Sequence, residues 1–174
     1  MMEWILRAGA VDARIHYLLL CRRRPRLTQA MFGITRLGDP PTLVFLGIVL
    51  LTVPLPLPAG SAVHGALGAL ATFLVSQALK RLISRPRPEL PMGLVRLIHP
   101  PDRFSFPSGH AAVSLAMVLP IALALPVVWT LPLLALTLLV GVSRAYLGVH
   151  YPGDVAAGWA LAFAVSAAAG GFLG

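Results

Sequence analysis

The fold of this chain is decided by residues 104–143, which read FSFPSGHAAVSLAMVLPIALALPVVWTLPLLALTLLVGVS. These 40 residues contain no Asp, Glu, Lys or Arg. A helix needs about 20 predominantly apolar residues to cross the hydrocarbon core of a bilayer, so the stretch is long enough for two spans. Pro120 and Pro126 interrupt it and indicate where one helix ends and the next begins.

Two other stretches of the 174-residue chain also lack charged side chains. Residues 40–79 suit two spans separated by a proline-rich break near residue 60, and residues 155–174 suit one. We therefore predict an all-α fold, a polytopic membrane helical bundle with five spanning helices. The helices are expected at 41–57, 62–80, 108–125, 127–145 and 153–173.

The composition restricts the class of protein. Hydrophobic residues make up 57% of the chain and charged residues 11%, whereas soluble domains carry about 25% charged residues. The net charge of +8 would fit a nucleic-acid partner, but such a protein presents its basic residues on a polar face, and most of this chain has none. We therefore expect a lipid bilayer as partner and no nucleic acid.

Residues 1–39 are expected to form an interfacial amphipathic segment that precedes a membrane-embedded core at 40–174. A helix over residues 4–20 gathers most of its apolar side chains on one side, although Asp12 interrupts that side. Four charged residues before Cys21 make this a poor spanning helix and a reasonable interfacial one. If it did cross the membrane, the chain would have six spans.

Five spans would place all 20 charged residues on one side of the membrane. They lie in the N-terminal segment, in and beside the loop between the second and third spans, and in and beside the loop between the fourth and fifth. Cytoplasmic segments carry an excess of Lys and Arg. We therefore expect a multi-pass protein of the inner (plasma) membrane, with its charged side facing the cytoplasm.

Two segments on the charged side carry residues suited to binding an oxyanion. Lys80 and Arg87 are separated by a proline-containing extended segment and could approach one anion from two directions, although the run also fits a plain topological anchor. Ser108 and Gly109 begin a helix, where backbone N–H groups and the helix dipole attract anions, although Ser108 also fits a plain N-cap. His110 could serve as a general acid.

A third segment contains Arg144, His150 and Asp154. A hydrogen bond from the His150 imidazole to Asp154 would fix the tautomer and leave the other ring nitrogen free as nucleophile or base. An Asp in the first turn of a helix is also stabilising by itself. Arg144 either extends to the lipid headgroups or holds a phosphate.

Together these segments form the pattern Lys-x6-Arg-Pro, Pro-Ser-Gly-His and Ser-Arg-x5-His-x3-Asp. The pattern resembles the type 2 phosphatidic acid phosphatase family, which shares its pocket with the vanadium haloperoxidases and glucose-6-phosphatase. The resemblance implies that His150 attacks phosphorus to form a phosphohistidine, that Asp154 orients it, and that His110 protonates the leaving oxygen and later activates water. It implies that the phosphate is held by Lys80, Arg87, Ser108, Gly109 and Arg144.

The resemblance further implies a lipid phosphatase that uses no metal and no cofactor and acts on a phosphate or diphosphate monoester. Phosphatidic acid, phosphatidylglycerophosphate, polyprenyl diphosphate and lipid A phosphates all fit, and the loop 89–103 is the expected selector. His99 in that loop matches no motif position and is not expected to carry chemistry, although it could touch the substrate. A lipid phosphotransferase that uses the same histidine and a non-catalytic protein that binds anionic lipid are alternatives. Many bacterial members of the family face the periplasm, which opposes the cytoplasmic placement that the charges favour.

Overall fold

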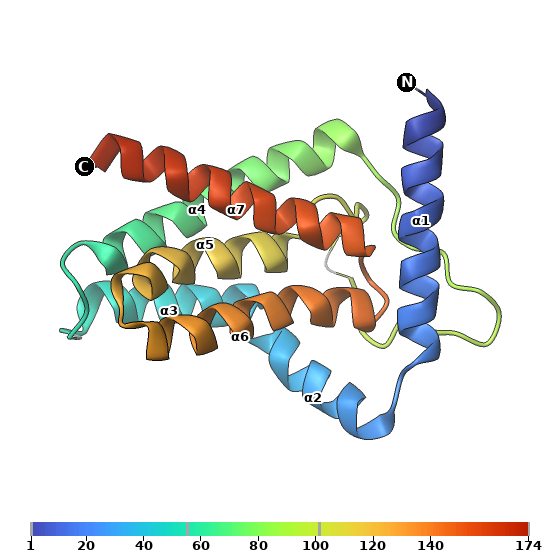
Figure 1. Ribbon diagram of the computed structural model, residues 1–174, viewed down its shortest axis with the longest axis horizontal. Helices are drawn as coiled ribbons and strands as arrows, with labels where there is room; N and C mark the ends of the chain where they lie inside the picture. The colour runs from blue at the N-terminus through green and yellow to red at the C-terminus, as the bar shows by residue number, and fades with distance from the viewer. Residues whose placement is uncertain (1, 55, 101, 174) are drawn as a thin grey trace.

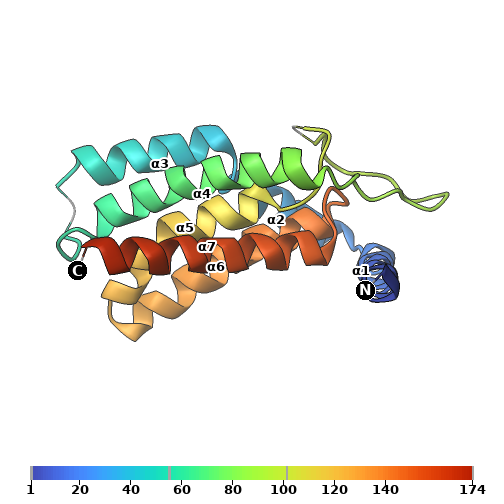
Figure 2. The same cartoon turned by 90° about the horizontal axis from the view of Figure 1, so that it is seen from above.

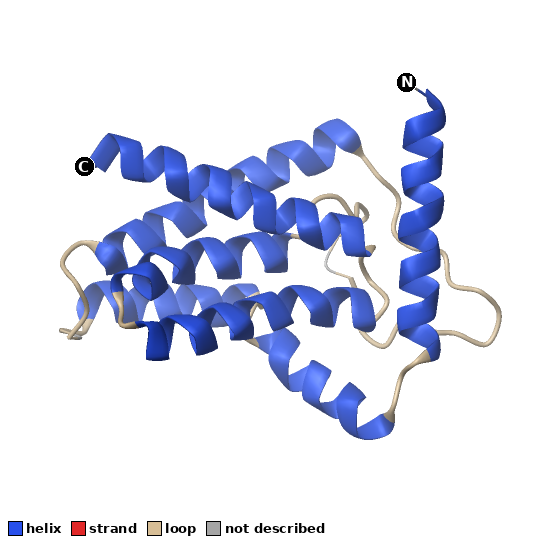
Figure 3. Ribbon diagram, in the orientation of Figure 1, coloured by secondary structure: helices blue, strands red, loops and turns tan. Residues whose placement is uncertain are grey.

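The computed structural model describes residues 2–54, 56–100 and 102–173, and this part of the chain is all-helical, with seven α-helices and no strand (Figure 3). The all-α prediction is therefore confirmed. The helices are α1 (Met2–Cys21), α2 (Pro25–Arg36), α3 (Pro40–Thr52), α4 (Ser61–Ile83), α5 (Gly109–Ala124), α6 (Val127–Tyr146) and α7 (Pro152–Leu173).

Helices α3 to α7 run side by side along one axis, whereas α1 lies across one end of this bundle (Figures 1 and 2). The central element is α5, which contacts α4, α6 and α7 and buries most of its side chains, Leu115 and Ala116 among them. All five expected bundle helices are therefore present, in the expected order.

Fewer helices are long and apolar enough to cross a membrane than the bundle contains. By length and composition, α4, α6 and residues 152–169 of α7 could each cross a membrane. The pair α2 and α3, bent by 51°, qualifies only as one broken span, and α5 is apolar but shorter. With 16 residues at 1.5 Å each, α5 is about 24 Å long. Five spans therefore stay a prediction.

The first bundle helix ends earlier than expected, at Thr52 instead of residue 57. The prolines that follow explain the difference: each lacks a backbone N–H and disfavours helical geometry in the residue before it. The opposite happens in α4, which continues to Ile83. There Ser84 adopts a left-handed conformation, with φ 51°, and its N–H donates to the Lys80 carbonyl.

The two ends of the bundle are formed by segments that differ in charge. The connection 53–60, the turn at 125–126 and the C-terminal end of α7 lie at one end, and none of them carries a charged residue. The loop 84–108, the loop 147–151 and α1 lie at the other end. The chemistry-bearing segments are thus collected at the charged end.

Close packing of α5 on α7 positions these segments. An ideal Cβ on Gly158 would lie 2.7 Å from the Ser108 carbonyl oxygen and 3.3 Å from the Ala111 Cβ. One turn further along α7, Ala162 is fully buried against the core formed with Leu115 and Leu119. Small residues let two helices approach closely, so the start of α5 is fixed directly against α7.

We expect Gly158→Val to destabilise the fold by about 1–3 kcal/mol, because the added side chain meets backbone that cannot rotate away. The measurement is the melting temperature in detergent, which should fall. Ala160→Val, on the exposed side of the same helix, is the control and should melt close to the wild type. Equal melting temperatures for both variants would contradict the packing argument.

Candidate active site

The residues that the sequence singles out lie together at the charged end of the bundle. They come from the end of α4 and the following loop, the start of α5, the end of α6, and the loop leading into α7. All but two of them are buried, and those two are half-buried. The buried residues are Lys80, Arg87, Ser108, Arg144, His150 and Asp154, and the half-buried ones are Gly109 and His110.

His150 and Asp154 are one helical turn apart at the start of α7. The Asp154 Oδ2 lies 3.6 Å from the His150 Nδ1, which is longer than a hydrogen bond. The same oxygen accepts a hydrogen bond from the Tyr151 N–H at 2.8 Å. The other oxygen, Oδ1, accepts one from Arg85 Nη1 at 2.7 Å, a contact that the sequence analysis did not anticipate.

The other nitrogen of His150 faces a cation. Arg87 Nη1 lies 3.3 Å from His150 Nε2 and donates to the Val149 carbonyl at 2.7 Å. A guanidinium has no acceptor, so the nitrogen that faces it carries a lone pair. The proton of the neutral ring is then on Nδ1, directed at Asp154.

Lys80 and Arg87 share one carboxylate, that of Asp102. Lys80 Nζ lies 2.5 Å from Asp102 Oδ2, and Arg87 Nη2 lies 2.7 Å from Oδ1. Burial raises the pKa of Asp102, but hydrogen bonds and charge from Lys80 and Arg87 outweigh it, so the pKa is lowered. Asp102 is therefore ionised and bridges the two cations, with one of them on each carboxylate oxygen. In the sequence, Asp102 is distinguished only as an acidic residue in a loop whose other charged residues are mostly basic.

Three buried polar atoms of the site have no hydrogen-bond partner among the described residues. These are Ser108 Oγ, Arg144 Nε and His150 Nδ1. Ser108 caps α5 without a side-chain hydrogen bond, so the plain N-cap interpretation does not account for its hydroxyl. Arg144 is held by one contact, from Nη1 to Thr35 Oγ1 at 2.8 Å. Buried polar groups are normally satisfied, so Ser108 Oγ and Arg144 Nε are available to a bound oxyanion, whereas His150 Nδ1 faces Asp154.

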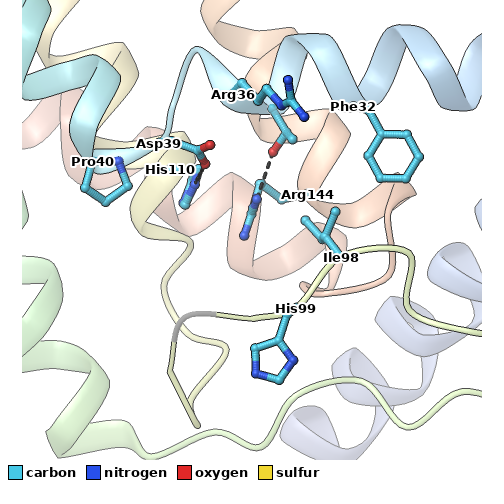
Figure 4. A pocket seen from close by; sticks show the side chains of 9 residues that line it. Phe32, Arg36, Asp39, Pro40, Ile98, His99, His110 and Arg144 are labelled. Atoms are coloured by element: carbon cyan, nitrogen blue, oxygen red, sulfur yellow. Dashed lines mark hydrogen bonds and ion pairs between the residues drawn. The ribbon is translucent and has the colours of Figure 1, made fainter.

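His110 faces a cavity of about 360 Å³ beside Arg144 (Figure 4). Its Nε2 lies 2.9 Å from Asp39 Oδ1, in the connection between α2 and α3. His99, from the loop expected to select substrate, lines the same cavity. The remaining lining residues are Phe32, Thr35, Arg36, Pro40 and Ile98.

The N-terminal segment contributes directly to this region. Thr35 and Asp39 come from it, and so does Asp12 of α1, whose Oδ1 accepts a hydrogen bond from the Gly153 N–H at 2.8 Å. The division of the chain at residue 39 stays a prediction. The sequence analysis did not identify these residues as partners of the motifs, because each lies far from them in sequence. The one signal was that Asp12 interrupts the apolar side of its helix.

The arrangement can bind a tetrahedral oxyanion and attack it. Three buried cations, Lys80, Arg87 and Arg144, and a helix N-terminus supply donors. A neutral imidazole presents a lone pair among them. Within the described ranges, no group of three or more His, Cys, Asp or Glu side chains is arranged to hold a metal ion.

Comparison with known proteins gives a consistent result. The family model described as PAP2 superfamily matches residues 61–170. A decaprenylphosphoryl-5-phosphoribose phosphatase of Mycobacterium tuberculosis is 33% identical over 145 residues, covering 83% of this chain and 79% of the relative. Phosphatidylglycerophosphatase B of Bacillus subtilis is 32% identical over 172 residues, covering 87% and 78%.

A solved structure is also similar to this chain. It is the crystal structure of a transmembrane PAP2-type phosphatidylglycerolphosphate phosphatase from Bacillus subtilis. The TM-score is 0.74 at 28% identity, over 95% of this chain and 85% of that one. The similarity therefore includes the N-terminal segment as well as the bundle.

The protonation of His150 gives a test of the site by pH. Burial lowers its pKa to about 4, with Arg87 and Arg144 adding to the effect against Asp154, whereas an unfolded chain has a His pKa near 6.5. Between these values the unfolded state binds more protons, so the free energy of unfolding decreases as the pH falls from about 6.5 towards 4. We expect His150→Asn, which cannot titrate, to lose less stability over this range.

The measurement is the melting temperature of both proteins in detergent between pH 7.5 and 4. Because other groups also titrate, only the difference between the two curves is interpreted. Identical curves would contradict a neutral, buried His150.

Proposed function

We propose that this chain, which belongs to the PAP2 superfamily, is a membrane lipid phosphatase that hydrolyses a phosphate or diphosphate monoester through a phosphohistidine. One observation carries the proposal: the lone pair of His150 Nε2 faces Arg87 in a buried, cation-lined site. A nucleophile beside fixed positive charge is the arrangement that attack on an anionic phosphate requires.

In the first step, His150 Nε2 forms a bond to phosphorus as the bond from phosphorus to the leaving oxygen breaks. Asp154 Oδ2, 3.6 Å from His150 Nδ1, stabilises the positive charge that develops on the ring. His110 delivers a proton to the leaving oxygen, which departs as an alcohol or, from a diphosphate, as a phosphate. Asp39, 2.9 Å from His110 Nε2, holds that ring in the cavity.

In the second step, His110 takes a proton from water, and the water oxygen attacks phosphorus. The bond between phosphorus and His150 breaks, which releases inorganic phosphate and restores the neutral imidazole. His110 has then given one proton to the leaving oxygen and gained one from water, so both histidines end the cycle in the protonation state in which they began.

Charge neutralisation by side chains supports a metal-independent reaction. Lys80, Arg87 and Arg144 carry three positive charges, and Asp102 carries one negative charge between the first two. The sum is +2, which matches a phosphomonoester dianion. Ser108 Oγ and the Gly109 N–H add donors that need no counter-charge. These groups supply what magnesium ions supply in kinases.

The substrate proposed is a phosphorylated lipid. Two relatives of this chain are named for decaprenylphosphoryl-5-phosphoribose and phosphatidylglycerophosphate, both of which are lipid-linked phosphates. The site lies at the polar end of apolar helices, so a headgroup can enter while its tail stays in the bilayer. Phosphatidic acid, phosphatidylglycerophosphate, polyprenyl diphosphate and lipid A phosphates belong to this class.

The proposed setting is the inner (plasma) membrane, with five spans and with α1 lying in the interface. The direction of α1 across the bundle supports this, because a helix perpendicular to spanning helices lies in the membrane plane (Figure 1). Its exposed Val11, Ile15 and Leu18 form an apolar row suited to that position. The excess of Lys and Arg at the site end favours a cytoplasmic site.

We expect His150→Ala to lower phosphate release from a panel of lipid phosphates by about three orders of magnitude or more, because the nucleophile is lost. The wild type should keep its rate in EDTA. His64→Ala, at the uncharged end of α4, is the matched control and should remain active. Wild-type turnover by His150→Ala would refute the nucleophile, and loss of activity in EDTA would refute the metal-free mechanism.

The orientation is testable because the end of α7 lies at the opposite end of the bundle from the site (Figure 1). With a cytoplasmic site, a C-terminal alkaline phosphatase fusion lies outside the cytoplasm and is active. A C-terminal green fluorescent protein fusion should then be dark. The reverse result would place the site on the outer side.

A further inference from the structure

Asp12 of α1 reaches from outside the bundle into the support of the active site. Its Oδ2 accepts a hydrogen bond from Arg85 Nη2 at 2.8 Å, and its Oδ1 accepts one from the Gly153 N–H at 2.8 Å. The Asp12 side chain is only 12% exposed. The residue that interrupts the apolar side of the helix is therefore satisfied by groups that border the site.

Arg85 connects Asp12 to Asp154. One terminal nitrogen of its guanidinium binds Asp12, and the other binds Asp154 Oδ1 at 2.7 Å. The guanidinium also lies over the Tyr151 ring, 4.3 Å from its centroid. Two ion pairs and the contact with the aromatic ring together fix the position of the planar Arg85 guanidinium.

The consequence for Asp154 is that its two oxygens have different tasks. Oδ1 is occupied by Arg85, so Oδ2 is the oxygen that faces His150 Nδ1. The Tyr151 N–H on Oδ2 fixes the same rotation. The orientation of the carboxylate is thus set by contacts that do not touch the substrate.

We propose that Asp12 and Arg85 are positioning residues for the His150–Asp154 pair, Asp12 holding Arg85 and Arg85 holding Asp154. The inference rests on the proposed function, because it assigns a role in catalysis to neighbours of the proposed nucleophile. It makes α1 part of the apparatus that orients that nucleophile.

The close approach of Asp12 depends on Gly153. An ideal Cβ at this glycine would lie 2.7 Å from Asp12 Oδ2. The carboxylate is the end of a side chain that can rotate, so a methyl group there displaces Asp12 and leaves α7 in place. Gly153→Ala therefore removes the contact without changing any charge, and it should reproduce the effect of Asp12→Asn.

The test is a kinetic cycle in detergent with Asp12→Asn, Arg85→Gln and the double variant. We expect kcat to fall about ten-fold in each single variant, as for one lost charge-assisted hydrogen bond, with KM changed far less. Because Asp12 acts through Arg85, the double variant should be no slower than Arg85→Gln alone. Losses that multiply in the double variant would overturn the proposal.

A pH profile separates positioning from general damage. Without Arg85, the negative charge of Asp154 is less compensated, which raises the pKa of His150. The acidic limb of kcat/KM should therefore move to higher pH in Arg85→Gln. The charges of Arg87 and Arg144, which also face the ring and lower the pKa of His150, stay in place and limit the size of the shift. An unmoved limb with a lowered kcat would indicate a structural defect and overturn the proposal.

Controls make the outcomes separable. Arg81→Gln changes an exposed charge near the end of α4 and should keep the wild-type rate. Stabilisation by inorganic phosphate, followed as a shift in melting temperature, should persist in Arg85→Gln because the phosphate-binding cations are intact. If His150→Ala is inactive while Asp12→Asn and Arg85→Gln turn over normally, the inference fails alone. If His150→Ala is active, the proposed function fails with it.

Discussion

A charged side chain at the centre of a bilayer costs about 2.5–3.5 kcal/mol even on the most lenient scales, and this cost organises the whole molecule. It keeps the helices α3 to α7 free of charge over most of their length. It also collects every charged group of the described chain at one end of the bundle or in α1 and α2 (Figure 1). Chemistry that needs cations, a carboxylate and imidazoles can be built only there.

Crowding cations into that end creates a second requirement, because buried like charges repel one another. The structure meets it by giving carboxylate partners to three of the four cations around the site. Lys80 and Arg87 share Asp102, and Arg85 lies between Asp12 and Asp154. Arg144 has only the Thr35 hydroxyl among the described residues. It is therefore the cation with the most to gain from an anionic ligand.

The sequence was sufficient for the five bundle helices. Charge-free windows have the length of spans, and prolines mark their breaks, so four of the five bundle helices begin and end within about three residues of where they were expected. The break after Thr52 was placed too late because three prolines in succession gave no single boundary. The helix α2 was missed because its apolar pattern is short and mixed with basic residues.

The partners of the motif residues could not be predicted in the same way. Asp12, Asp39 and Asp102 are single acids without periodicity, and Asp12 meets Gly153 across 141 positions of sequence. Only folding brings such residues together, since no local rule links an acid in one helix to a histidine or arginine in another. An acid on the apolar side of an amphipathic helix was the one available signal, and it indicates a partner that the helix itself does not supply.

The Asp102 carboxylate, which Lys80 and Arg87 share, affects how the site distinguishes its substrate from the other phosphate headgroups of the membrane. Most headgroups of a membrane are phosphodiesters with a single negative charge, whereas a terminal phosphate carries nearly two at neutral pH. Asp102 lowers the positive potential of the site, which weakens the attraction for both kinds of headgroup and weakens it more for the dianion. Selection therefore cannot come from charge alone. A diester offers two unesterified oxygens and a terminal phosphate three, so the donors that an additional oxygen can fill, Ser108 Oγ and Arg144 Nε among them, are the means of telling the two apart.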